Sequence, residues 1–361
     1  MSEFVHTSIH NRTGSIVLDR PQALNSLSLP MVRALSATLL AWRADPQVDA
    51  VVIRSSSPKA FCAGGDIRFF YDAGRATPQG GSAALEDFFT EEYALNHVIH
   101  HYPKPYIALI DGVVMGGGMG VSQAGPASRL RIVTEGSKMA MPEVNIGLFP
   151  DVGGSYFLPR CPGRLGRYLA LTGSTIGAAD ALHAGLADCF VPRARMPALV
   201  ELIDNVPGAG LRQAIADFAA PHRGEAGVAP FEANGAAIAR HFGAASVAAI
   251  VRSLARDTSA FASQAAAALA RRSPLMLAVT FELLERGATL ALADCLRMER
   301  TLVRHNFEHG EVLEGVRALV IDKDQAPRWS PPGLELVTPA MVARFFEPVW
   351  PEAAHPLRDL A

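Results

Sequence analysis

The chain has 361 residues, of which 49% are hydrophobic and 19% are charged. This length excludes a small scaffold held together by disulfides, and the apolar content excludes an intrinsically disordered chain. Lys and Arg total 33 against 35 Asp and Glu, which gives a net charge of −2. The chain therefore lacks the basic excess that binds a phosphate backbone, and we expect no nucleic-acid partner.

The cysteines and the first residues bear on the cellular compartment. The charge-free stretch between Asp111 and Arg129 is too rich in glycine and polar residues to span a bilayer, and the first residues lack the basic start and apolar run of a signal peptide. The cysteines lie far apart with no CxxC pair, which excludes a disulfide framework and a zinc ribbon. We expect a cytoplasmic protein with no membrane partner. The four cysteines are Cys62, Cys161, Cys189 and Cys295.

The first half of the chain alternates short β-type runs with helical patterns. After Pro30, the apolar residues Leu35, Leu39 and Trp42 recur at helical spacing, and Pro46 ends that pattern. Strands separated by helices of this length predict an α/β fold whose sheet is covered on both faces. The predicted strands are residues 15–18, 50–53, 106–110 and 130–133.

The second half of the chain is predicted to be mainly helical. Alanine-rich helical patterns cover residues 261–272 and 275–286. Residues 219–230 carry two prolines and two glycines with few large apolar side chains, which is typical of a linker or loop. We therefore expect a core with the substrate site in residues 1–196 and a mainly helical region covering that site in residues 197–361.

Two glycine clusters follow apolar β-type runs, at residues 63–66 and 115–120. Neither contains GxGxxG, and the chain has no GxxxxGK[ST] or GxSxG, so the usual signs of a dinucleotide site, a P-loop and a serine hydrolase are absent. The clusters fit tight turns with close backbone packing. Alternatively, two backbone N–H groups from the separate loops form an oxyanion hole for a carbonyl oxygen that becomes negative.

Two carboxylates lie eight residues apart in an apolar segment punctuated by proline and glycine. They are Glu143 and Asp151, within residues 141–154. Desolvation in such a segment raises the pKa of a carboxyl group and makes it usable as a base, nucleophile or acid near neutral pH. The same positions also suit two residues that cap helices.

Other titratable residues have simpler interpretations. The three histidines of residues 97–101 lie at metal-ligand spacing, but no carboxylate or cysteine completes the set, so we expect the C-terminal end of a helix there. Glu91, Glu92 and Tyr93 are expected on a solvated helix face, and Glu92 matters for function only if this helix lines a pocket.

A series of loops resembles the crotonase (enoyl-CoA hydratase/isomerase) superfamily in order and spacing. That resemblance implies a spiral of ββα units, a CoA thioester as substrate, and an oxyanion hole made by the backbone N–H groups of Gly65 and Gly117. It implies no metal or redox cofactor, because CoA is part of the substrate, and it leaves room for a homo-oligomer. The segments that carry it are Arg20-Pro21, Ala23-Leu24-Asn25-Ser26-Leu27, Lys59-Ala60-Phe61-Cys62-Ala63-Gly64-Gly65-Asp66-Ile67, Lys104-Pro105, Asp111-Gly112 and Gly116-Gly117-Gly118.

Within the superfamily, residues 143–154 and 315–325 resemble the subfamily of 3-hydroxyisobutyryl-CoA hydrolases. This resemblance implies hydrolysis of a short branched 3-hydroxyacyl-CoA to the free acid and CoA, in valine catabolism. Glu143 would then act as nucleophile or as base for water, and Asp151 would hold the substrate hydroxyl or protonate the leaving thiolate. The positions that match the subfamily's substrate and catalytic residues are Glu92, Gly117, Glu143 and Asp151.

Two alternative functions stay open on the residues alone. The first is an enoyl-CoA hydratase or isomerase. In the hydratases a glutamate lies just after the triple glycine, at the position that is Gly120 in this chain, so a mechanism with two glutamates would lose one participant. The second alternative is a non-catalytic protein that binds acyl-CoA.

Overall fold

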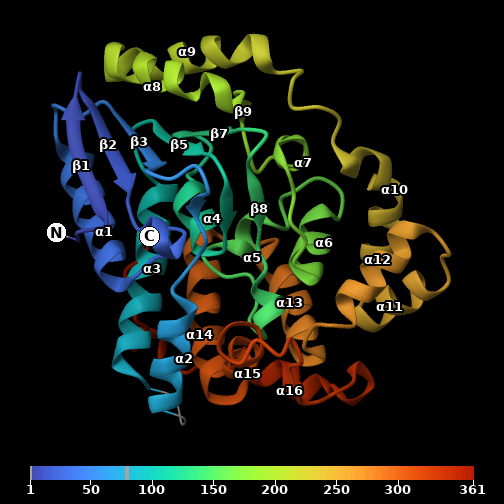
Figure 1. The fold of residues 1–361 in the computed structure, drawn as a ribbon. Helices are drawn as coiled ribbons and strands as arrows, with labels where there is room; N and C mark the ends of the chain where they lie inside the picture. The colour runs from blue at the N-terminus through green and yellow to red at the C-terminus, as the bar shows by residue number, and fades with distance from the viewer. Residues whose placement is uncertain (1, 78–80) are drawn as a thin grey trace. The chain divides into compact units, whose positions relative to one another are not determined.

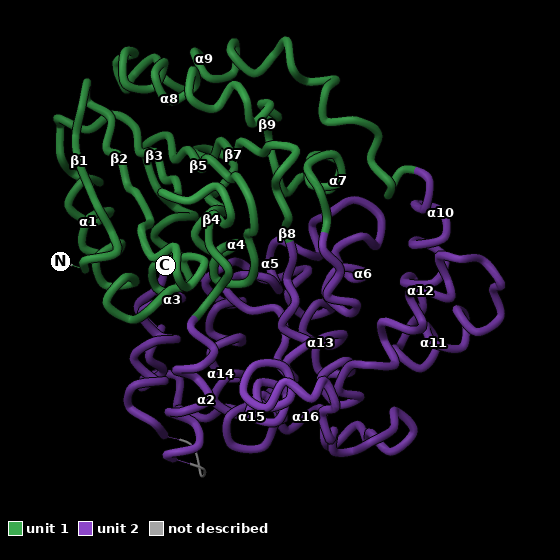
Figure 2. The backbone as a smooth tube through the Cα atoms, viewed as in Figure 1, with its two compact units in different colours: residues 1–65, 94–139, 176–232 green, residues 66–93, 140–175, 233–361 purple. Residues whose placement is uncertain are grey.

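The computed structural model describes residues 2–77 and 81–361, which form two compact units. The first unit contains residues 1–65, 94–139 and 176–232, and the second contains residues 66–93, 140–175 and 233–361 (Figure 2). Each unit is thus assembled from three separate segments of the chain. Helices α3 (Ala83–His100) and α10 (Pro230–Phe242) contain two of the points where the chain passes from one unit to the other.

A six-stranded sheet organises the first unit, with the strand order β1-β2-β3-β5-β7-β9 (Figure 1). Strands β1 and β2 are antiparallel, and every following pair is parallel. The four predicted runs all lie within strands of this sheet, so the α/β prediction is confirmed. The strands are β1 (Val5–His10), β2 (Thr13–Leu18), β3 (Ala50–Ser55), β5 (Tyr106–Ile110), β7 (Arg129–Val133) and β9 (Cys189–Phe190).

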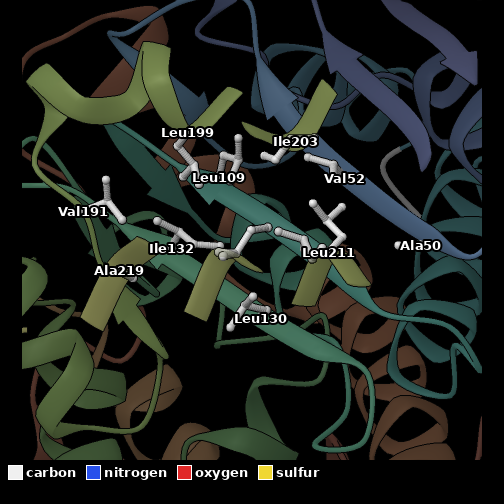
Figure 3. Close-up of a cluster of buried hydrophobic side chains, with 12 residues drawn as sticks. Ala50, Val52, Leu109, Leu130, Ile132, Val191, Leu199, Ile203, Leu211 and Ala219 are labelled. Carbon is white, nitrogen blue, oxygen red and sulfur yellow. The ribbon is translucent and has the colours of Figure 1, made fainter. Parts of the chain in front are cut away.

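One face of this sheet packs against helices α8 (Met196–Asn205) and α9 (Gly208–Ala219). Leu109 and Ile132 point from the strands toward Leu199 and Leu211 of these helices (Figure 3). A central parallel strand is buried on both faces, which explains why β5 is a continuous apolar run with every residue buried. The other helical elements of this unit are η1 (Pro21–Ala23), α1 (Leu29–Ala44), α4 (Gly117–Ser122), α7 (Ala178–His183), η3 (Arg193–Arg195) and η4 (Ala220–His222).

A second sheet, with the strand order β4-β6-β8, carries the two glycine clusters. Its strands are β4 (Ala60–Cys62), β6 (Val113–Met115) and β8 (Lys138–Ala140). The first cluster follows β4 and leads into helix α2 (Ile67–Ala76), and the second follows β6 and leads into α4. Each cluster therefore lies between a strand of this sheet and a helix.

The second unit is mainly helical. Helices α12 (Ala260–Leu269) and α13 (Pro274–Gly287) confirm the two alanine-rich predictions to within a few residues, and the Ser273 side chain caps α13 by accepting a hydrogen bond from the N–H of Met276. The remaining helical elements of this unit are η2 (Glu143–Ile146), α5 (Gly154–Phe157), α6 (Leu165–Thr172), α11 (Val247–Ala255), α14 (Leu292–His309), α15 (Val312–Val316), η5 (Arg317–Ile321), η6 (Leu334–Leu336), α16 (Pro339–Arg344) and η7 (Glu352–Ala354).

Candidate active site

Four buried carboxyl side chains gather in the second unit. Glu92 is 2% exposed on α3, and Glu143 is 7% exposed at the start of η2. Asp151 is 5% exposed in the loop before α5, and Glu299 on α14 is fully buried. Charged side chains are almost never buried to this degree without a partner, so this cluster requires a functional or structural reason.

The backbone around Glu143 turns sharply and brings the glutamate to the start of a short 3₁₀ helix. Gly147 ends that helix with a φ of 68°, and a Cβ there would lie 2.6 Å from the carbonyl oxygen of Glu311. Pro142 occupies the N-cap position and no side chain caps the helix. The capping alternative for Glu143 is therefore wrong, and among the described residues its Oε2 atom has no hydrogen-bond partner.

Asp151 has a direct partner that the sequence did not reveal. The phenolic O–H of Tyr93 donates a hydrogen bond of 2.6 Å to Asp151 Oδ2. The N-cap of the following helix α5 is Gly153, and no side chain of that loop caps it. The capping alternative for the Asp151 side chain is therefore also wrong, and its carboxylate is held by Tyr93 instead.

The expectation of a solvated helix face at Glu92 and Tyr93 is wrong. Tyr93 is fully buried, with its ring 6.0 Å from that of Phe89, and Phe89 in turn lies 5.7 Å from Phe307 of α14. These aromatic rings exclude water from this turn of α3, which carries the adjacent Glu92 into the same apolar surroundings. The two glutamates in the sequence suggest a solvated helix face, although the aromatic side chains of this helix are buried.

Burial and mutual repulsion raise the pKa values of the carboxyl groups. Burial, followed by the charge of Asp151, raises the pKa of both Glu92 and Glu143 well above the ordinary value. Burial raises the pKa of Asp151 to about 6, although the hydrogen bond from Tyr93 opposes that rise. The hydrogen bond from Tyr93 favours the charged form of Asp151.

Ionisation of Asp151 should make the protein less stable as the pH rises. Its folded-state pKa of about 6 lies above the ordinary value of 3.8, so its contribution to stability is full below pH 4 and is lost as the pH rises through about 6. The free energy of unfolding of Asp151→Asn can be compared with that of wild type at each pH. We expect this difference to favour the variant by about 3 kcal/mol more at pH 8 than at pH 4. Chemical denaturation at both pH values measures this difference.

The exposed Asp359 offers the matched control, because Asp359→Asn makes the same chemical change at a side chain that is 87% exposed. We expect its effect on the unfolding free energy to be the same at both pH values. An Asp151→Asn variant that behaves in the same way would show that Asp151 ionises without cost in the folded protein.

The two glycine loops meet within the first unit. Leu27 forms a parallel β-bridge with Gly65, and Gly64 adopts a φ of 104°. A Cβ on Gly64 would lie 3.2 Å from the carbonyl oxygen of Met115 and 3.7 Å from the backbone nitrogen of Gly117. The loops of the two predicted oxyanion donors, Gly65 and Gly117, are therefore in contact, and Gly117 is the first residue of α4.

One group among the described residues has the side chains to hold a metal ion. The ligand atoms of His305, Glu308 and His309 on α14 lie within 4.8 Å of one another. However, Arg304 donates to Glu308, and Arg344 donates to His309. These two cations oppose a bound metal ion, so the group fits an ion-pair cluster better than a metal centre.

The described helices and the four cysteines bear on the cellular setting of the protein. No helix in residues 2–77 or 81–361 is both long enough and apolar enough to cross a bilayer. All four cysteines are free thiols, and Cys62, Cys161 and Cys295 are buried. The prediction that the cysteines form no disulfide framework is confirmed.

Comparison with known proteins identifies the family. Residues 13–346 match the family model described as enoyl-CoA hydratase/isomerase. The mitochondrial 3-hydroxyisobutyryl-CoA hydrolase of Xenopus tropicalis is 42% identical over 343 residues, covering 92% of this chain and 86% of that protein. The protein of the same name from Danio rerio is 41% identical over 340 residues, covering 93% of this chain and 87% of that protein. A solved structure named as a carnitinyl-CoA dehydratase from Mycobacterium thermoresistibile has a TM-score of 0.88 at 37% identity, covering 97% of this chain and 98% of that one. The fold, the family match and these relatives show that the chain belongs to the crotonase, or enoyl-CoA hydratase/isomerase, family.

Proposed function

We propose that this protein hydrolyses a short branched 3-hydroxyacyl-CoA thioester, 3-hydroxyisobutyryl-CoA, to the free acid and CoA. The observation that carries the proposal is a buried Glu143, in a cluster with Asp151, that has a raised pKa and an Oε2 without a partner in the described part of the chain. Two relatives that are 42% and 41% identical bear the name of this hydrolase. A buried carboxylate with a free oxygen is suited to attack a carbonyl carbon or to activate water.

In the proposed reaction, an oxygen nucleophile adds to the thioester carbonyl carbon. Glu143 either supplies that oxygen itself or takes a proton from the attacking water. The backbone N–H groups of Gly65 and Gly117 stabilise the negative charge on the carbonyl oxygen. The tetrahedral intermediate then collapses, the C–S bond breaks, and the CoA thiolate leaves with the bonding electrons and takes up a proton. In the route through a Glu143 acyl anhydride, water then hydrolyses that anhydride.

Asp151 and Glu92 complete the proposed site. Asp151 keeps its Oδ2 on the Tyr93 hydroxyl, and its carboxyl group accepts a hydrogen bond from the substrate hydroxyl or delivers the proton to the leaving thiolate. The Oε1 atom of Glu92 is buried and unpartnered among the described residues, so it offers a polar contact to the acyl group. Buried polar atoms without partners are costly, and a bound substrate would supply the partners.

The names of two solved structures favour the hydratase alternative. One is an enoyl-CoA hydratase from Rhodobacter sphaeroides, 39% identical with a TM-score of 0.84, and the other is the carnitinyl-CoA dehydratase from Mycobacterium thermoresistibile. Gly120 argues against it, because the second position after the triple glycine has no carboxylate here and lies in α4 as a buried glycine. The non-catalytic alternative leaves the buried carboxyl cluster without a purpose. Release of free thiol from acyl-CoA separates the hydrolase from both alternatives.

Thiol release across a panel of acyl-CoA esters tests the proposal and gives a prediction on specificity. A site that binds a substrate hydroxyl rejects the analogue without it by up to roughly 10⁴-fold, because its buried polar groups lose their partner. We expect kcat/KM for 3-hydroxyisobutyryl-CoA to exceed that for isobutyryl-CoA by at least about 10²-fold. Equal values would contradict a role for Asp151 or Glu92 in binding the hydroxyl, and hydration of an enoyl-CoA without thiol release would contradict the hydrolase.

The cellular setting follows from the same proposal. Hydrolysis of 3-hydroxyisobutyryl-CoA belongs to valine catabolism, and the reaction needs no metal or redox cofactor. Acyl-CoA is then the principal partner, and we expect neither nucleic acid nor membrane as partners. Four free thiols fit a reducing compartment such as the cytoplasm, while the vertebrate relatives are named as mitochondrial.

A further inference from the structure

The buried Glu299 side chain binds the backbone that directly follows Asp151. The N–H of Gly153 donates to Glu299 Oε2 at 2.8 Å, and the N–H of Ser155 donates to Oε1 at 3.0 Å. The hydroxyl of Ser155 donates to the same Oε1 atom. One carboxylate on α14 thus accepts three hydrogen bonds from a segment about 145 residues earlier in the chain.

This segment has a backbone conformation that its sequence alone does not favour. Val152 has a φ of 50° and Gly153 a φ of 87°, so two consecutive residues are left-handed. A β-branched residue such as valine is a genuine outlier at positive φ, and such strain persists only where the surrounding structure enforces it. The N-cap of α5, Gly153, has no side chain to bond the free N–H groups, and Glu299 bonds them in its place.

The segment is also fixed from helix α13. A Cβ on Gly287 would lie 2.1 Å from the carbonyl oxygen of Ser155, so only a glycine allows the α13 backbone to approach so closely. Ser155 is fully buried, and both of its hydrogen-bond donors are directed to Glu299. Helices α13 and α14 together therefore leave this turn little freedom to move.

We propose that Glu299 is a positioning residue, which holds the strained turn at residues 152–155 and thereby fixes the Asp151 carboxylate for reaction. The inference rests on the proposed function, since it takes Asp151 to act on the substrate. Glu299 touches the backbone beyond Asp151 and acts through it. A small displacement of a reacting group can cost about 10²-fold in rate, so the turn is a sensitive point.

The charge of Glu299 has a second effect on the same cluster. It contributes to the raised pKa of Glu143, while burial raises the pKa of Glu299 itself to about 8. Because a carboxyl group with this pKa is charged mainly above a pH of about 8, Glu299→Gln should leave the acid limb of kcat/KM unchanged. The titratable groups around Glu143 and Glu299 are Glu92, Tyr93, Asp151 and Cys295.

The test compares Glu299→Gln with Glu282→Gln, the same change at a half-buried glutamate on α13 that pairs with Arg286. Glutamine keeps the shape of Glu299, but its NH₂ group faces N–H donors and cannot accept their hydrogen bonds. We expect kcat of Glu299→Gln to fall at least about tenfold with little change in KM. Glu282→Gln should match wild type in each measurement.

A rescue experiment separates the backbone role from general stability. In the Glu299→Gln background, Val152→Gly removes the steric cost of positive φ, whereas Val152→Ala removes most of the same side chain but keeps the Cβ. We expect the glycine double variant to recover more kcat than the alanine double variant. Equal kcat for the two double variants would contradict the strained-turn role.

Amide hydrogen exchange tests the same contact without an activity. We expect the amides of Gly153 and Ser155 to exchange at least about tenfold faster in Glu299→Gln than in Glu282→Gln. Ser155→Ala loses one of the three donors to Glu299, so we expect an intermediate increase in that variant. It also serves as the test variant in case Glu299→Gln does not fold. Unchanged exchange in both Glu299→Gln and Ser155→Ala would overturn the inference. Wild-type protein that releases no thiol would overturn the proposed function instead, so the two failures are distinguishable.

Discussion

Glu143→Gln should abolish nearly all thiol release from 3-hydroxyisobutyryl-CoA while the substrate still binds. Glutamine keeps the shape of the side chain but provides neither a carboxylate nucleophile nor a base for water. A general base contributes roughly 10²–10⁴-fold to a rate, and a nucleophile contributes at least as much, so we expect kcat to fall by about 10³-fold or more. Steady-state kinetics with thiol detection gives kcat, and titration with the substrate or with CoA gives the affinity.

Glu311 provides the matched control for this experiment. It is 7% exposed, and like Glu143 its pKa is raised by burial, but its carboxylate accepts hydrogen bonds from Ser273 and from the N–H of Ser330. Glu311→Gln therefore makes the same change at a buried glutamate whose oxygens have partners, and we expect it to keep kcat within about threefold of wild type. A well-folded Glu143→Gln enzyme with similar activity would refute the proposed mechanism.

Local patterns in the sequence are sufficient to predict much of the fold. The run at residues 106–110 is read as a buried strand because it is apolar throughout, and the structure places it at the centre of the sheet as β5. The helix that begins near Pro30 and stops at Asp45 is equally local, since proline fits its first turn. Glu143 and Asp151 stand out for a related reason, because carboxylates in an apolar segment conflict with their surroundings.

The partners of these carboxylates could not be predicted from local patterns. Tyr93 lies 58 residues before Asp151, and Glu299 lies 146 residues beyond Gly153. Each is surrounded in sequence by polar or charged residues that suit a solvated helix, and only the folded chain shows them facing an apolar interior. Val152 is a similar case, because nothing about a valine predicts that its φ is positive.

Local sequence patterns also do not predict which segments of the chain combine to form each compact unit. Composition changes near residue 197, but residues 66–93 and 140–175 group with the C-terminal helices through long-range contacts. The predicted division at residue 196 lies where the composition of the chain changes. As a domain boundary it stays a prediction. Contacts between distant segments decide which elements form one compact unit, and those contacts leave no periodic signal.

Gly117→Pro should lower kcat by about 10²- to 10³-fold, the usual cost of losing one oxyanion-hole donor. The substitution suits the local structure, because Gly117 is the first residue of α4 and proline is well tolerated at that position of a helix. Proline removes the backbone N–H that we propose binds the thioester oxygen, and no hydrogen bond within a helix depends on that N–H. The effect should therefore appear in kcat with little loss of thermal stability.

Gly117→Ala is the control for the oxyanion hole, because alanine adds a methyl group but keeps the N–H. We expect Gly117→Ala to retain much more activity than Gly117→Pro, with both melting temperatures measured to confirm folding. If the two variants lose activity equally, the side-chain volume is responsible and the N–H is not a donor to the substrate. If folded Gly117→Pro keeps a kcat near that of wild type, negative charge on the thioester oxygen must be stabilised without this residue, and the role assigned to Gly117 fails.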